Sequence, residues 1–212
     1  MSILDKAIAA ITPPVSKEKR EEAHAKARAA AKPGDWLSQI LDHHEAIEEA
    51  FAATRAAATA DARRTAQKRL GVLLNGHAMA EEAVIYPAIA HAGNQGHANT
   101  AYTEQVAAKM QMAALESLDP MGEDYVDKLG HLEGAVLTHA YQEESDWFLD
   151  FMEKAPPEAQ AHATTRYLEE YGRYIDGGAI PGVAGEPRSF VRDAAQPSDP
   201  SVSHGASSTG LI

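Results

Sequence analysis

The chain has 212 residues, no cysteine and a formal net charge of −12 at pH 7. Without cysteine it cannot form disulfides, use a cysteine nucleophile or bind metals through thiolates, so any metal must bind through nitrogen and oxygen. The negative charge argues against nucleic acids and anionic membranes as partners. No uncharged apolar run of about 18 residues occurs, and we expect a soluble, cytoplasmic protein of one domain with tails.

Helical periodicity, interrupted by Pro and Gly, runs through most of the chain. Ser16 and Asp35 are the expected N-caps of the first two helices, and Pro33-Gly34 separates these helices. Pro87 bends or ends the third helix, and the breaker-rich segment 91–97 follows it. The expected helices, in chain order, cover residues 17–32, 36 to about 54, 61–87, 100–117, 123–153 and 158–175.

Four of these helices are long and joined by short turns, which predicts an all-α fold: an up-down-up-down four-helix bundle with extra N- and C-terminal helices. We expect an N-terminal extension with a short helix over residues 1–34 and the bundle over residues 35–155. An additional helix over residues 156–176 is expected to lie across the bundle. Residues 177–212 are rich in Gly, Pro and Ser, which predicts a flexible tail.

A histidine and a glutamate four residues apart occur three times on the expected helices. The pairs are His44 and Glu48, His77 and Glu81, and His139 and Glu143. Because four residues make about one helical turn, each pair projects an imidazole and a carboxylate from one face, where they can hold one metal ion or reach across two. Chance alone would give roughly one such pair in a chain of this composition.

The positions of the pairs strengthen this interpretation. His44 lies about 14 residues before the first turn and His77 about 17 after it, so at a rise of about 1.5 Å per residue the two histidines share one level. Gln105 and His139 flank the turn at Asp119 in the same way. The three pairs therefore converge on one layer of the bundle, where a metal centre is the simplest way to keep buried carboxylates charged.

Three motifs, each extended beyond its pair, resemble those of one family. They are Asp42-His43-His44 leading to Phe51, His77-x-x-x-Glu81-Glu82 leading to Ile85-Tyr86-Pro87, and His139-x-x-x-Glu143-Glu144 leading to Trp147-Phe148. With them, residues 35–155 resemble the hemerythrin-like proteins that carry the HHE cation-binding domain. The resemblance implies a centre of two iron ions bridged by carboxylates and an oxo or hydroxo group, with His44, His77, Glu81, His139 and Glu143 as ligands.

The chain departs from the family on the expected helix over residues 100–117, where Gln105 stands in place of the usual histidine. Gln105 either binds metal through its carbonyl oxygen or only hydrogen-bonds a ligand. Glu48 either replaces the missing donor or pairs with Lys109. Our hypothesis is a centre of three histidines and three glutamates, which suits iron or manganese. Its ligands would be His44, Glu48, His77, Glu81, His139 and Glu143.

Neighbouring residues receive simpler interpretations. We expect His43 to pack or hydrogen-bond, because it points about 100 degrees away from His44 on the helix. Glu82 and Glu144 either orient imidazoles of the site or lie on solvated faces, and we expect the solvated faces; Tyr86 is expected in the apolar core beside the site. No role is assigned to His24.

Function is less determined than the site. A centre short of full protein coordination leaves a position for a small diatomic or peroxide ligand, such as dioxygen, nitric oxide or peroxide. The candidate functions are binding or sensing, an oxidoreductase that consumes peroxide or nitric oxide with an external electron donor, iron storage or iron-centre repair, and a structural metal. Reversible oxygen carriage is associated with five histidines in the family, and this chain has three at matching positions, which favours redox chemistry or sensing. The last helix could also form the interface of a homodimer.

Overall fold

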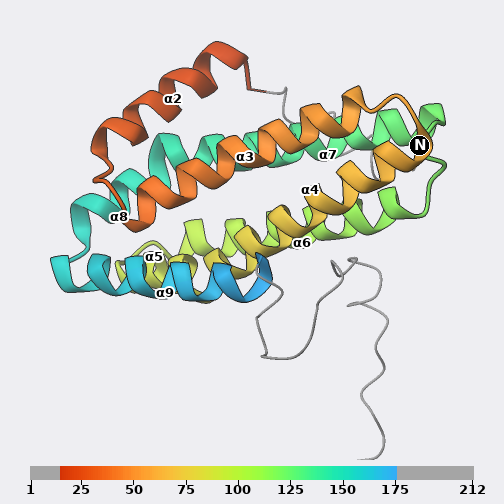
Figure 1. Cartoon of the computed structure of the whole chain (residues 1–212). Coiled ribbons are helices and arrows are strands. Elements are labelled where there is room, and N and C mark those ends of the chain that lie inside the picture. The colour runs from red at the N-terminus through yellow and green to blue at the C-terminus, as the bar shows by residue number, and fades with distance from the viewer. Residues whose placement is uncertain (1–14, 176–212) are drawn as a thin grey trace, which may run out of the picture.

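The computed structural model describes residues 15–175 of the chain. Four long helices form an antiparallel bundle (Figure 1). They are α3 (Trp36–Ala56), α4 (Ala60–Ala80), α6 (Gln95–Glu116) and α7 (Glu123–Gln142). The expected all-α four-helix bundle is confirmed, with one extra helix before it and one after it. The flexible tail expected over residues 177–212 lies outside the described residues.

The N-terminal helix α2 (Lys17–Ala30) packs against α3 and the C-terminal half of the bundle. Both predicted caps are confirmed. The Ser16 hydroxyl accepts a hydrogen bond from the backbone N–H of Lys19, and the Asp35 carboxylate accepts one of 2.8 Å from the N–H of Ser38. Each cap satisfies an N–H group that the first helical turn leaves without a partner. Gly34, at φ +78°, supplies the left-handed residue of the turn between the helices.

Two π-helical turns interrupt the long helices at the predicted metal ligands. The first, η1 (Glu81–Ile85), joins α4 to α5 (Tyr86–His91), and the second, η2 (Glu143–Trp147), joins α7 to α8 (Phe148–Lys154). A π turn holds one residue more than an α turn, and such turns are frequent at functional sites. Pro87 therefore follows a register shift, and the helical path continues to His91 instead of ending at the proline.

Helix α6 begins at Gln95, earlier than the expected start at about residue 100. The connection from α5 is a tight turn, because Gly93 adopts φ +103° and reverses the chain within a few residues. The side chain of Asn94 donates a hydrogen bond to the Asp150 carboxylate of α8, which ties this turn to the other hairpin. The breaker residues therefore form a shorter loop than the sequence predicted.

The buried apolar side chains form two clusters, one on each side of a polar layer. The first lies around Trp36, whose ring meets Phe148 edge to face at 5.4 Å between centroids. The second lies toward the α3–α4 and α6–α7 turns and includes Ile47, Phe51 and Leu70. Burying a side chain of this size contributes about 1.5–3 kcal/mol. Two apolar layers thus hold the bundle together and leave the layer between them free for polar groups.

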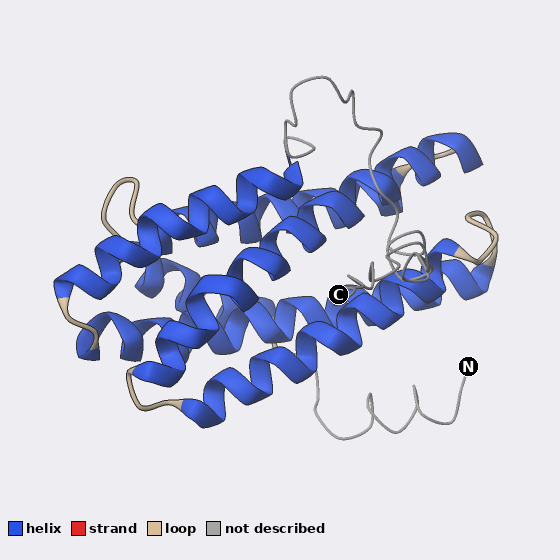
Figure 2. Ribbon diagram, turned by 90° about the horizontal axis from the view of Figure 1, so that it is seen from below, coloured by secondary structure: helices blue, strands red, loops and turns tan. Residues whose placement is uncertain are grey.

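The last described helix, α9 (Pro157–Ile175), packs against α3, α4 and η1. Seen from below, the described residues form helices joined by short loops, with no strand among them (Figure 2). Its buried residues Ala163 and Tyr167 belong to the first apolar cluster. The helix therefore covers the level of the polar layer, and Tyr167 reaches it.

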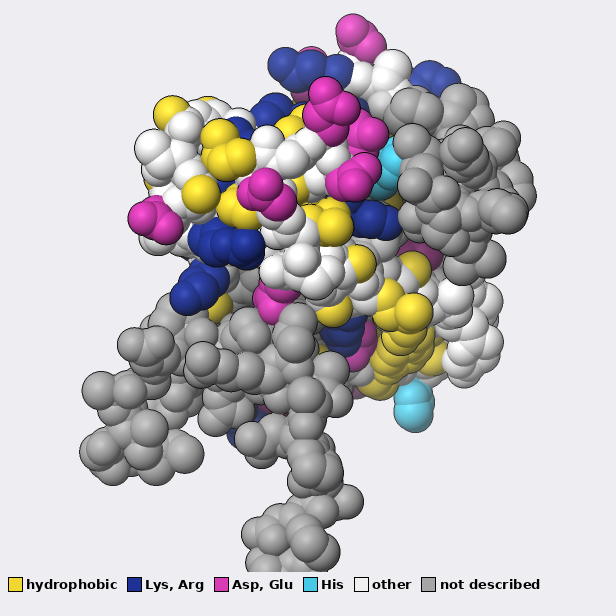
Figure 3. Space-filling model, turned by 90° about the vertical axis from the view of Figure 1, so that its right-hand side faces the viewer, with side chains coloured by type: hydrophobic (Ala, Val, Ile, Leu, Met, Phe, Trp, Pro, Cys, Tyr) yellow, Lys and Arg dark blue, Asp and Glu magenta, His cyan; other side chains and the backbone are white. Residues whose placement is uncertain are grey.

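The end of the bundle at the α3–α4 and α6–α7 turns carries acidic, basic and apolar side chains side by side (Figure 3). In the part of the chain that the structure describes, no helix is both long enough and apolar enough to cross a membrane.

Candidate metal centre

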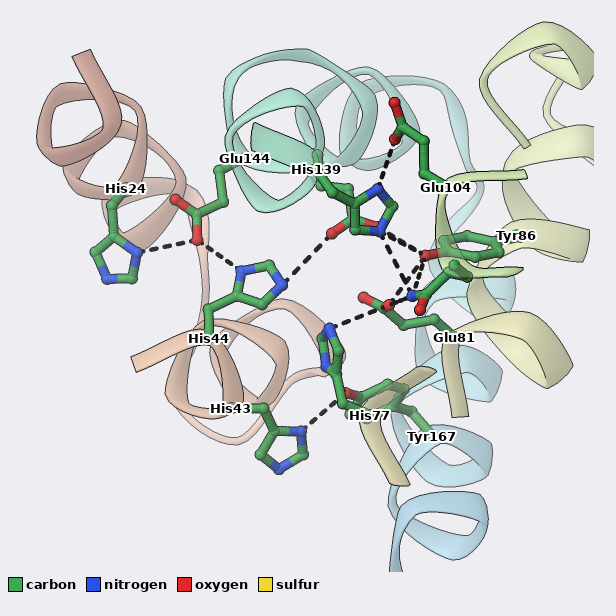
Figure 4. A network of polar contacts seen from close by, with 12 residues as sticks. His24, His43, His44, His77, Glu81, Tyr86, Glu104, His139, Glu144 and Tyr167 are labelled. Atoms are coloured by element: carbon green, nitrogen blue, oxygen red, sulfur yellow. Dashed lines mark hydrogen bonds and ion pairs between the residues drawn. The ribbon is translucent and has the colours of Figure 1, made fainter. Parts of the chain in front are cut away.

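Four side chains, two from α-helices and one from each π turn, meet in the polar layer, and Figure 4 labels three of them, His44, His77 and Glu81. His44 comes from α3, His77 from α4, Glu81 from the start of η1 and Glu143 from the start of η2. One donor atom from each lies within 4.8 Å of all the others. His77 Nε2 is 3.1 Å from Glu81 Oε2, and His44 Nε2 is 3.4 Å from Glu143 Oε2. We call these four residues the donor cluster.

Three atoms of the donor cluster are buried without a hydrogen-bond partner among the described residues: His44 Nε2, Glu81 Oε1 and Glu143 Oε2. Two of them, His44 Nε2 and Glu143 Oε2, face each other at 3.4 Å, and this distance is an ion pair only when His44 is protonated. Unpaired polar atoms in a protein interior are costly, and native structures rarely keep several in one place. A bound cation would provide the missing partner for all three. The residues present therefore fit a metal held by nitrogen and oxygen donors.

Glu143 also connects the donor cluster to His139. Its Oε1 atom lies 3.3 Å from His139 Nε2, whereas its Oε2 atom faces His44. The other ring nitrogen of His139 donates a hydrogen bond of 2.8 Å to Glu104. The two oxygens of one carboxylate thus face histidines of different helices, which is the arrangement that a bridging carboxylate requires.

The phenol of Tyr86 occupies the centre of this second side. Its oxygen lies 3.0 Å from Glu81 Oε2, 3.1 Å from Glu143 Oε1 and 3.1 Å from His139 Nε2. The hydroxyl hydrogen can be donated to only one of these atoms at a time. The expectation that Tyr86 lies in the apolar core beside the site is confirmed for its ring, which belongs to the first apolar cluster. The sequence did not show that the hydroxyl reaches the site, because Tyr86 lies five residues after Glu81, a spacing that faces the same way only across a π turn.

Of the two alternatives for Gln105, metal binding through its carbonyl oxygen or hydrogen bonding to a ligand, the structure shows hydrogen bonding. Its amide Nε2 donates to Glu81 Oε2 at 2.9 Å and to the Tyr86 oxygen at 2.8 Å. The side chain is buried, so these hydrogen bonds fix its orientation. In this structure Gln105 hydrogen-bonds a predicted ligand and does not direct its carbonyl oxygen at the donor cluster.

Glu48 is the predicted ligand that the structure does not bring to the others. Its side chain is 55% exposed, and its nearest basic group is Arg20 Nη2 of α2 at 3.9 Å. Lys109, the alternative partner, instead forms a 2.6 Å ion pair with Glu82. One turn along α3 from His44, the helix face has rotated enough to direct Glu48 toward α2 and solvent.

Glu144 lies behind His44, so the expected solvated face is wrong and the alternative role, hydrogen bonding to an imidazole of the site, is the one that the structure shows. It is 4% exposed, and its Oε1 atom accepts hydrogen bonds from His44 Nδ1 at 2.7 Å and from His24 Nδ1 at 3.1 Å. His24 also donates to Glu45 at 2.9 Å. Helix α2 covers Glu144. The sequence alone did not show this burial, because it depends on packing between residues that are far apart in the chain. The contact orients His44 so that Nε2 faces the cluster.

His77 is held in a similar way by α9. The hydroxyl oxygen of Tyr167 lies 3.2 Å from His77 Nδ1 and 2.8 Å from His43 Nδ1. The hydrogen-bonding role expected for His43 is confirmed, and its ring also stacks on Tyr171 at 3.6 Å between centroids. Both histidines of the donor cluster therefore present Nε2 to it and use Nδ1 for support, as metal-binding histidines commonly do.

Residues 36–149, more than half of the chain, match the hemerythrin HHE cation-binding domain. The chain belongs to this family. A segment of 75 residues, 35% of the chain, is 32% identical to a protein described as a DNA nickase from Nostoc sp. (strain PCC 7120). The match covers 21% of that relative, so the chain spans only about a fifth of the relative's length. No solved structure matches the chain.

The electrostatics of the HHE domain show what the donor cluster does without a cation. Burial alone would lower the pKa of His44, but the carboxylates of Glu143 and Glu144 outweigh burial and raise this pKa to about 10. Burial, together with charged His44, lowers the pKa of His77. Burial and the nearby Glu143 carboxylate raise the pKa of Glu81. A proton on His44 therefore offsets the Glu143 and Glu144 carboxylates, and a proton on Glu81 removes its buried charge; a bound cation would offset these charges in their place.

The HHE domain therefore carries a His and Glu cluster able to bind metal. Its donors are imidazole nitrogens and carboxylate oxygens, a set that binds divalent first-row transition metals. Five of the sequence-predicted residues meet in or beside the cluster, whereas Tyr86, Gln105, Glu144 and Tyr167 complete it through hydrogen bonds.

Proposed function

We propose that the protein holds two iron ions in the polar layer and that this pair binds or reacts with dioxygen, nitric oxide or peroxide. The observation that carries the proposal is the placement of Glu143, whose Oε2 faces His44 and whose Oε1 lies 3.3 Å from His139 Nε2. One carboxylate between two groups of donors supports two metal positions, with Glu143 shared by both.

The first position would use His44, His77, Glu81 and Glu143, the four residues of the donor cluster. The second would use His139 and the remaining carboxylate oxygens. It has fewer protein donors, because Gln105 and Tyr86 stand where a further histidine would be needed. A pair of iron ions supplies one- and two-electron chemistry toward small oxidants, and a position short of protein donors leaves room for such a ligand.

The side chains around the cluster would shield the bound metal on one side and fix the orientation of its donors. Phe148 and Tyr86 are fully buried, and Trp147 is nearly so; together they close the layer on the side of the first apolar cluster. Glu144 and Tyr167 fix the two imidazoles, so that the donors need not reorganise when a metal changes its charge. Turnover of peroxide or nitric oxide would further require an external electron donor, which we include in the proposal.

An iron titration of anaerobically purified protein tests the proposal. We expect two ferrous ions per chain, followed by new visible absorption when dioxygen, nitric oxide or peroxide is added separately. A Glu82→Ala variant is the control, because Glu82 adjoins Glu81 but pairs with Lys109 outside the cluster. Fewer than one iron per chain, or exclusive retention of zinc, would contradict the proposal.

A further inference from the structure

A groove of about 420 Å³ lies between α4, α6 and α7, and its inner end is the polar layer. His44, His77 and His139 line that end. The rest of the lining is mostly apolar and includes Leu74, Met112 and Val136. A diatomic ligand needs only a small fraction of such a volume, which falls in the range of sites that bind organic molecules, roughly 300–1,000 Å³.

The groove is elongated along the helices. On α7 its lining extends from Ala140 back to Gly130, and on α6 from Glu104 to Met112. At about 1.5 Å per residue, these stretches correspond to roughly 12–15 Å. A molecule that fills the groove would therefore lie parallel to α7 with one end at the donor cluster.

Missing side chains create this space. Gly130 and Gly134 are one helical turn apart on α7, and a Cβ atom built on either would meet no atom within 4 Å. Across the groove, α6 contributes the short side chains of Ala107 and Ala108. Neither glycine has a positive φ, so the backbone does not require glycine at these positions.

The charges in the lining are already paired. Glu104 accepts a hydrogen bond from His139 Nδ1, and Lys109 pairs with Glu82 at 2.6 Å. A charged ligand would have to compete with these contacts, whereas a neutral molecule would leave both intact. The charge pattern thus favours a neutral occupant with a mainly apolar body.

We propose that the groove is a binding site for a neutral, elongated, largely apolar organic molecule whose inner end reaches the donor cluster. The proposal deepens the proposed function by naming the class of substrate or effector, and it rests on that function only for what happens at the metal end. Binding itself depends on the groove and can be measured without metal.

The neutral fluorophore N-phenyl-1-naphthylamine is a suitable probe, because its emission rises when it enters an apolar site. We expect saturable binding of one probe per full-length chain. Gly134→Leu places its Cβ atom in open space and directs an apolar side chain into the groove, which should weaken binding by at least about tenfold. Gly96→Leu is the matched control: Gly96 also lies in a helix with open space at its Cβ, but outside the groove, and binding should stay unchanged.

Two outcomes overturn the groove proposal. One is the absence of saturable probe binding by the full chain. The other is equal binding by wild type and Gly134→Leu, provided that Gly134→Leu keeps the helical circular dichroism of the wild type.

Measurements on metal-free and iron-loaded protein separate the two proposals. Probe binding without iron loading would support the groove and contradict the two-iron centre. Two irons without probe binding would support the centre and contradict the groove.

Discussion

The two halves of the bundle use the same backbone device with different side chains. In each half a long helix carries a histidine and, one turn later, a glutamate that opens a π turn: His77 and Glu81 before α5, His139 and Glu143 before α8. The partner helices differ, since α3 supplies His44 and α6 supplies Gln105. Three donor atoms on the His44 side have no hydrogen-bond partner, whereas His139 is bonded at both ring nitrogens.

This difference indicates that the π turn and the residue on the partner helix have different roles. The π turn directs the glutamate into the polar layer in both halves. The partner residue, His44 or Gln105, determines whether the donor atoms lack a hydrogen-bond partner or are hydrogen-bonded within the protein. On this basis we expect the position beside His44 to bind metal tightly and the position beside His139 to bind it more weakly.

Removal of Glu143 should have the largest effect, because this residue faces both positions. In Glu143→Ala we expect the loss of at least one metal per chain and a fall in the affinity of the remaining one by about 100-fold or more. Elemental analysis of protein loaded with a limiting amount of iron measures both. Glu82→Ala should keep the full metal content, and equal metal content in the two variants would refute the bridging assignment.

Metal affinity should rise with pH. Without metal, His44 holds a proton up to about pH 10, because the Glu143 and Glu144 carboxylates outweigh its burial, and the pKa of Glu81 is also raised. The metal-free form therefore binds more protons than the loaded form, so raising the pH favours metal binding. We expect about a tenfold gain per pH unit for each displaced proton, with proton release detectable in weak buffer during titration. An affinity that is flat between about pH 6 and 9 would contradict this account.

Gln105→His makes the second half of the bundle resemble the first. The imidazole would replace an amide that donates to Glu81 and Tyr86, and it would offer a nitrogen to the weaker position. We expect the affinity of the second metal to rise about tenfold, while the first is unchanged. Stepwise binding curves resolve the two events. Gln105→Leu is the control of similar size without a donor, and a gain in that variant as well would show that the imidazole is not the cause.

Most of the fold followed from the sequence, because periodicity and breakers act locally. The caps at Ser16 and Asp35 and the order of the helices depend on neighbouring residues only. The helix boundaries near Pro87 and Gly93 were predicted less well from the sequence. There the π turn shifts the register before the proline, and a single left-handed glycine closes the loop.

The candidate site was predictable only as far as helical spacing reaches. His77 and Glu81 share one helix face, as do His139 and Glu143, and His44 stands at the level of His77 across the first turn, so their convergence could be derived. The supporting contacts could not be derived in this way. Glu144 is buried by α2, His77 is supported by α9, and Tyr86 enters through the extra residue of a π turn. These depend on tertiary packing, which spacing along one helix does not encode.

Glu48→Ala should have the smallest effect and tests the limit of that reasoning. The spacing from His44 predicted a ligand, but the carboxylate is 55% exposed, and its ion pair with Arg20 is long at 3.9 Å. Exposed pairs of this kind contribute about 0–1 kcal/mol, so thermal unfolding should shift little and metal content should stay the same. Loss of one metal per chain would show instead that Glu48 turns inward when the centre is loaded. In that case α3 would supply two donors, and the asymmetry between the two halves would be larger than the structure indicates.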